Sequence, residues 1–229
     1  MGEKKKKEET MKTVKKVLIV GACVLFVVLM VVSGMGSGWL TMFTSVRPGD
    51  SVVVDYTIFD AAGQPIVTSE KATYDTVVGK NRQIFGSKQL TIISNQTIEK
   101  PIYSVPVYPS NGASVKQLAI FSSEYNVITS AIIGMKVNEQ KRIPIGSNIS
   151  MTQDWSVEQL AQSKINLTDI NVGDNFFMGV SDNPEAVVNN TTATTFLRIG
   201  EVASKSPEGI VVDFSYPSID IRVLSINKQ

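Results

Sequence analysis

Residues 127–139 read VITSAIIGMKVNE, and they decide the fold because they combine the end of a helix, a turn and the approach to a strand. Residues 125–133 are predicted to form one short helix, because Gly134 stands just past its end, where glycine commonly follows a helix. Residues 140–145 (QKRIPI) come next and are predicted to form a strand. The middle of the chain therefore combines helix with strand.

Most of the chain after residue 46 has the pattern of strands. Residues 51–59 (SVVVDYTIF) mix β-branched and aromatic residues between two turn segments, residues 47–50 (RPGD) and 60–63 (DAAG). A second short helix is predicted at residues 156–163, and a turn at residues 166–170. Further strands are predicted at residues 76–78, 90–93, 102–107, 116–121, 196–202, 210–214 and 219–226. Many strands and few helices predict a β-rich α+β protein.

The N-terminus has the composition of a membrane anchor. Residues 1–16 carry seven of the 22 basic residues beside three acidic ones, and residues 17–46 contain no charged residue. Because about 20 apolar residues span the hydrocarbon of a bilayer, residues 17–39 are predicted to be a transmembrane helix. Residues 40–46 are then a linker to the rest of the chain.

The charges around this helix predict its orientation. Lysines precede it, which predicts a cytoplasmic basic tail at residues 1–16 and an extracytoplasmic C-terminal part anchored in the cell membrane by a single pass. A cleaved signal peptide is the alternative, although its apolar region usually has only about 7–15 residues. An extracytoplasmic location would also allow glycosylation at the five Asn-x-Ser/Thr sequons, which begin at Asn95, Asn148, Asn166, Asn189 and Asn190.

Composition excludes several classes of function. The chain has no histidine, which removes Ser-His-Asp and Cys-His catalysis and histidine-ligated zinc. The only cysteine, Cys23, lies in the apolar run, so disulfides and cysteine-rich metal sites are excluded too. We therefore expect no metal and no cofactor. Beyond residue 16 the chain holds 15 basic and 18 acidic residues, so we expect no nucleic-acid partner.

Three blocks of sequence follow one another after the anchor. The first consists of residues 47–50 and 52–56 (VVVDY), followed after a turn by Gly63 and residues 68–69 (TS). The second is residues 127–139 with residues 141–145 (KRIPI). The third is residues 211–217 (VVDFSYP), followed by Ile219, Ile221 and Val223. In this order the blocks resemble the opening strands, the helix with its turn, and the last strand of the FKBP-type peptidyl-prolyl cis-trans isomerases, in the SlyD-like branch.

The resemblance implies a domain organisation. An antiparallel sheet wrapped on a short helix would be formed by residues 47–146 and 213–229. In the SlyD-like branch a small chaperone domain is inserted in the flap, and residues 147–212 occupy that place here as a β-rich insert. An extra insertion at about 80–124 matches nothing in the family. Its prolines alternate with apolar residues, which predicts an edge strand or extended loop beside the pocket.

The resemblance also implies a peptidyl-prolyl isomerase, or rotamase. The X-Pro amide rotates over a barrier of about 18–20 kcal/mol, and an apolar pocket lowers it by favouring the twisted amide. The chemistry needs no histidine and no cofactor. By position, Tyr56, Val127 and Ile128 are implied as the catalytic residues. The substrate-binding positions are Ile66, Val67, Ala131, Met151 and Ile221.

Several of these positions depart from the family pattern. Ile66 and Val67 stand where a phenylalanine and an aspartate are usual, Ala131 replaces a large aromatic residue, and Met151 falls near the flap tyrosine. The resemblance therefore predicts an isomerase or chaperone that acts on proline-containing or unfolded polypeptides of the envelope. Because of these departures, two alternative functions stay open: an inactive FKBP-like binding module and a structural subunit of a membrane complex. Three aromatic residues of the insert are expected to form either a chaperone surface or part of the core: Trp155, Phe176 and Phe177.

Overall fold

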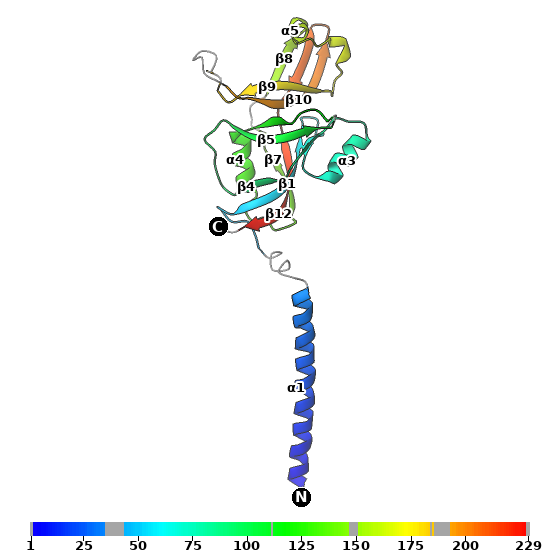
Figure 1. Ribbon diagram of the computed structural model, residues 1–229, viewed down its shortest axis with the longest axis vertical. Coiled ribbons are helices and arrows are strands. Elements are labelled where there is room, and N and C mark those ends of the chain that lie inside the picture. The colour runs from blue at the N-terminus through cyan, green and yellow to red at the C-terminus, as the bar shows by residue number, and fades with distance from the viewer. Residues whose placement is uncertain are drawn as a thin grey trace. The chain divides into compact units, whose positions relative to one another are not determined.

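The computed structural model of the chain describes residues 2–34, 44–110, 112–146, 151–183, 185 and 193–227. The chain divides into two compact units, Met1–Thr44 and Ser45–Gln229. The first consists mainly of one helix, and the second contains the strands (Figure 1). The prediction of a β-rich α+β protein with an apolar N-terminal helix is confirmed.

Helix α1 (Gly2–Gly34) forms the first unit. Its segment Val14–Val31 has a mean hydropathy of 2.6 and is long and apolar enough to cross a membrane. The helix starts at Gly2, so the basic residues predicted as a separate tail belong to the same helix. The predicted end of the span at residue 39 and most of the predicted linker lie outside the described residues.

Strand β1 (Ser51–Phe59) pairs with three other strands of the sheet. It pairs antiparallel with β12 (Ser218–Asn227) along its whole length, and also with β2 (Pro65–Thr68) and β4 (Leu90–Ile93). Strand β7 (Gln140–Pro144) pairs with β12 on the side away from β1. Because successive residues of a strand point to opposite faces, every second residue of β1 enters one large hydrophobic cluster: Val52, Val54, Tyr56 and Ile58.

Helix α4 (Ser122–Ala131) packs on this cluster through Tyr125 and Ile128. At its start, the Phe121 N–H donates to Oε2 of Glu124 at 2.9 Å, which is half of a capping box. After its end, Gly134 has φ +84° and donates its N–H to the Val46 carbonyl at 2.9 Å. The predicted helix at residues 125–133 is confirmed in place, but it begins three residues earlier and ends two residues earlier.

One predicted strand is wrong. Residues 76–78 lie in helix α3 (Lys71–Gly79), of which only Val77 is buried. A short apolar run cannot distinguish a strand from a helix by periodicity. The helix connects β2 to β3 (Phe85–Ser87), and these two strands pair in parallel.

The expected edge strand is also corrected. Strand β5 (Ile102–Pro109) lies between β3 and β6 (Lys116–Phe121) in the sheet order. The Pro106 carbonyl accepts a hydrogen bond from Oγ of Ser87, so this residue faces β3. The N–H and C=O of one residue in an antiparallel strand point to the same side. Pro106 has no N–H to donate. Because this side of Pro106 faces β3, the donor is lacking just beyond Ser87, which is the last paired residue of that short strand.

A second hydrophobic cluster is built by residues 151–214. Strands β8 (Thr152–Ser156), β9 (Asn175–Ser181), β10 (Thr195–Ser206) and β11 (Gly209–Asp213) form its sheet portion. Helix α5 (Val157–Gln162) and the short 3-10 helix Leu167–Asp169 complete it. The cluster consists of Leu160, Ile170, Phe176, Val202, Ile210, Val212 and Phe214. Strand β10 meets β6 through a single parallel pair, Leu197 with Leu118.

A buried arginine links the two clusters. Arg198 of β10 is fully buried, and its Nη1 and Nη2 donate to the two carboxylate oxygens of Glu124 on α4 at 2.9 and 2.6 Å. Its remaining N–H groups donate to the carbonyls of Phe214 and Ala119, and its guanidinium carbon lies 3.5 Å from the ring centre of Tyr216. A charge this deep needs such full pairing to be tolerated.

Candidate functional site

Most of the positions carried over from the isomerase resemblance lie together. Tyr56 on β1 is directly opposite Ile221 on β12, and Val67 on β2 is opposite the neighbouring Ile58. Helix α4 adds Ile128 to the same hydrophobic cluster. Five residues that are far apart in the chain therefore share one place in the structure: Tyr56, Ile66, Val67, Ile128 and Ile221.

These five side chains are buried members of the main hydrophobic cluster. Their exposed fractions lie between 0% and 3%. Five of the hollows on the described residues are lined by other side chains. In this structure the positions form packed core, and a substrate would have to displace side chains to reach them.

The hydroxyl of Tyr56 is engaged by the protein itself. It donates to Oγ of Ser87 on β3 at 2.6 Å, and Ser87 is in turn bonded to the Pro106 carbonyl at 3.0 Å. Burial raises the pKa of Tyr56 far above its ordinary value, so the group stays protonated at neutral pH. A residue of strand β3 therefore already accepts the hydrogen bond of the Tyr56 hydroxyl, the group that the family resemblance would place against substrate.

The other implied pocket residues lie elsewhere. Val127 is 41% exposed, because neighbouring residues on a helix point about 100° apart and Ile128 takes the buried face. Ala131 packs on the rim of the main cluster. Met151 packs on the second cluster, with its sulfur 3.8 Å from Nη2 of Arg198. The structure therefore does not bring Val127 and Met151 to the group around Tyr56.

The three aromatic residues of the expected insert divide between core and surface. Trp155 and Phe176 pack on each other with ring centres 5.0 Å apart, and Phe176 is buried in the second cluster. Phe177, the next residue on β9, points to the opposite face and is 44% exposed. Its ring meets Phe85 of the main cluster edge-on, at 5.8 Å between centres.

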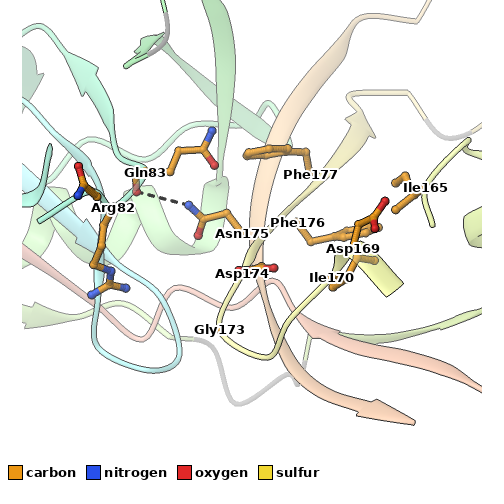
Figure 2. A pocket seen from close by; sticks show the side chains of 11 residues that line it. Arg82, Gln83, Ile165, Asp169, Ile170, Gly173, Asp174, Asn175, Phe176 and Phe177 are labelled. Carbon is orange, nitrogen blue, oxygen red and sulfur yellow. Dashed lines mark hydrogen bonds between the residues drawn. The ribbon is translucent and has the colours of Figure 1, made fainter. Parts of the chain in front are cut away.

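A hollow of about 540 Å³ opens beside Phe177 (Figure 2). One wall is the loop between α3 and β3, with Asn81, Arg82 and Gln83. The other wall comes from the segment around the 3-10 helix and the start of β9. Asn175 bridges the two walls, because its side-chain N–H donates to the Gln83 carbonyl at 3.5 Å. The second wall consists of Ile165, Asp169, Ile170, Gly173, Asp174, Asn175, Phe176 and Phe177.

The lining of this hollow combines apolar side chains with amides and with both signs of charge. Asp174 is held in a turn, since its Oδ2 accepts from the Asn171 N–H at 2.7 Å. Arg82 donates to Oε1 of Gln64 outside the hollow. Within the described ranges, no three acidic, cysteine or histidine side chains are grouped as metal ligands would be.

The sequence did not point to the Arg82–Gln83 wall of the hollow. The loop between α3 and β3 was assigned to an unmatched insertion, and its contact with β9 joins residues about 90 positions apart. The one signal in the sequence was the aromatic pair Phe176–Phe177, which predicts one buried and one outward ring if the segment is a strand. Comparison of the chain with protein-family models and with curated proteins finds no match.

Proposed function

We propose that this chain is a membrane-anchored folding factor that holds segments of other polypeptides on the extracytoplasmic side. Its framework is FKBP-like, and its polypeptide-binding surface is the hollow beside Phe177. Isomerase chemistry is not its main activity, because two of the three implied catalytic residues, Tyr56 and Ile128, are closed by their own packing. Helix α1 supplies the anchor.

The strand order supports an FKBP-like framework. The first resembling block lies in β1 and at the end of β2. The second forms the second half of α4 and most of β7, and the third lies at the end of β11 and in β12. These blocks meet in the order β7-β12-β1-β2, with α4 packed on the same cluster. Sequences that resemble a family in three separated blocks would be expected to bring those blocks together in space.

The observation that carries the binding function is Phe177. An aromatic ring that is 44% exposed at the edge of a hollow, which asparagine and glutamine residues also line, resembles the centre of a polypeptide-binding surface. Extended chains offer both apolar side chains and backbone amides, and the hollow contains partners for both. Burying this ring under a bound segment adds binding free energy without changing the fold.

Suppression of aggregation by the full chain in detergent tests the proposal. An unfolded model protein is diluted with increasing amounts of the chain, and light scattering gives the apparent affinity. Phe177→Ser is expected to weaken that affinity about tenfold, for the loss of about 1.4 kcal/mol of aromatic contact. Val172→Ser is the matched control, because Val172 is 60% exposed in the same segment but does not line the hollow.

Two results would contradict the proposal. One is a wild-type chain that leaves aggregation unchanged at every ratio. The other is equal weakening by Phe177→Ser and Val172→Ser, which would place binding outside the hollow. A chain that fails both tests and co-purifies with a defined membrane partner would instead be a structural subunit.

Prolyl isomerisation is the second candidate, and the co-location of Tyr56, Ile66, Val67, Ile128 and Ile221 favours it. Catalysis requires these side chains to part and admit an X-Pro segment. An isomerase would accelerate a proline-limited refolding reaction at substoichiometric amounts. The exposed variant Val127→Ser would then slow the reaction while leaving stability unchanged. We expect little or no acceleration from the closed cluster.

A further inference from the structure

Two of the five sequons lie within the described residues. They are Asn95-Gln96-Thr97, after β4, and Asn166-Leu167-Thr168, which enters the 3-10 helix. The other three begin at Asn148, Asn189 and Asn190, outside the described residues. Both described asparagines and both threonines are exposed. A bulky hydrophilic glycan on either asparagine is therefore compatible with the folded chain.

The first sequon is an anchored turn with an outward side chain. Asn95 has φ +59°, a left-handed conformation that asparagine tolerates better than most residues. Its backbone N–H donates to the Thr129 carbonyl at 2.9 Å, and the Gln96 carbonyl accepts from Oγ1 of Thr129 at 2.8 Å. These bonds fix the backbone of the turn to α4 and leave the Asn95 side chain on the surface.

The second sequon has its own side-chain turn. Oδ1 of Asn166 accepts from the backbone N–H of Thr168 at 3.2 Å, which brings the amide group next to the threonine of the same sequon. Asn166 also adjoins Ile165, which lines the hollow beside Phe177. A glycan at this position would stand at the rim of the proposed binding surface.

We propose that Asn95 and Asn166 are N-glycosylated. The donor would be a sugar joined to a membrane lipid through phosphate. Nδ2 of the asparagine forms a bond to the anomeric carbon, the bond from that carbon to the phosphate oxygen breaks, and the lipid phosphate leaves. One amide proton passes to a base of the transferase. The inference rests on the extracytoplasmic orientation in the proposed function, because transfer occurs on that side of the membrane.

The test is translation of the full chain in the presence of microsomal vesicles that carry an oligosaccharyl transferase. Each occupied asparagine adds one step of mass on a gel, and an amidase that removes N-glycans reverses it. Asn95→Gln and Asn166→Gln are each expected to remove one step. Thr97→Ser and Thr168→Ser keep the sequon and should retain the step, whereas Thr97→Val and Thr168→Val should lose it.

Asn81→Gln is the matched control. Asn81 is exposed and has φ +55°, much like Asn95, but it is followed by Arg82-Gln83 and forms no sequon. Its substitution should leave the gel pattern unchanged. Protease protection of the vesicles is measured in parallel. If the vesicles protect the domain from protease but the gel shows no mass steps that depend on Asn95 and Asn166, the two glycosylation sites are overturned and the orientation stands. If the protease digests the domain, both the proposed orientation and the glycosylation inference are overturned. The holding of polypeptides is tested separately, by the aggregation assay with the unmodified chain.

Discussion

Gly200 is a residue whose importance depends on its neighbours in the fold. It is buried in β10, where a Cβ atom would lie 2.6 Å from Cδ1 of Phe214 and 2.8 Å from Cγ1 of Val212. Real Cβ atoms do not approach other atoms so closely, so any larger residue must push the Phe214 ring out of the second cluster. The packing of this cluster therefore requires glycine at position 200.

Gly200→Ala is expected to destabilise the chain by about 1–3 kcal/mol, the usual cost of overpacking a core. Gly79→Ala is the control, because its Cβ would meet nothing within 4 Å at the end of α3. That change should be neutral or stabilising by up to about 1 kcal/mol. Denaturant unfolding of the purified chain measures both, and equal effects at the two positions would refute the packing argument.

A buried ion pair connects α4 to β10. The Arg198–Glu124 pair is bidentate and nearly water-free, with side-chain exposures of 0% and 5%. In contrast, the Lys71–Asp75 pair within α3 is exposed on both sides. Burial makes the first pair sensitive to loss of either partner, while solvent screens the second.

Glu124→Gln is predicted to cost about 3–5 kcal/mol, because it leaves the guanidinium of Arg198 buried without its counter-charge. Asp75→Asn, which removes the exposed pair, should cost less than about 1 kcal/mol. The midpoints of urea unfolding compare the two changes. If Glu124→Gln proved as mild as Asp75→Asn, the pair would have to be open to water in solution.

Local sequence predicted the bounds of some helices and strands more accurately than those of others. Strands β1, β4 and β6 match their predicted bounds, because β-branched and aromatic runs between turn residues are a local signal. Residues 76–78 of helix α3 were predicted as a strand, since periodicity does not distinguish a strand from a helix in so short an apolar run. Strand β8 is mostly polar and exposed, so its pairing with β11 had no signature in the sequence.

At the scale of the whole chain, the second unit begins with residues that its core requires. Val46 is buried, and its N–H donates to the Met135 carbonyl at 2.8 Å. Ser45 forms a bridge with Lys136 next to it. Both hydrophobic clusters are complete within Ser45–Gln229, so this unit should fold without α1.

A fragment of residues 45–229 is therefore expected to be soluble and cooperatively folded, whereas the full chain stays in the membrane fraction after alkaline extraction. A fragment of residues 48–229 should be about 1.5–3 kcal/mol less stable, because it loses the buried Val46 side chain. Denaturant unfolding of the two fragments checks this difference. Equal stabilities would mean that residues 45–47 do not belong to the unit.

The sequence by itself determined the apolar N-terminal helix, the β-rich α+β class, and most strand positions, because these depend on composition and on short periodic patterns. Through a family resemblance it also grouped eight residues as one pocket: Tyr56, Ile66, Val67, Val127, Ile128, Ala131, Met151 and Ile221. Only the tertiary structure decided that five of them are packed shut in one cluster, that Arg198 meets Glu124, and that Gln83 contacts β9. Closure, ion pairing and cavity walls depend on contacts between distant segments, and local patterns carry no information about which distant side chains fill a space.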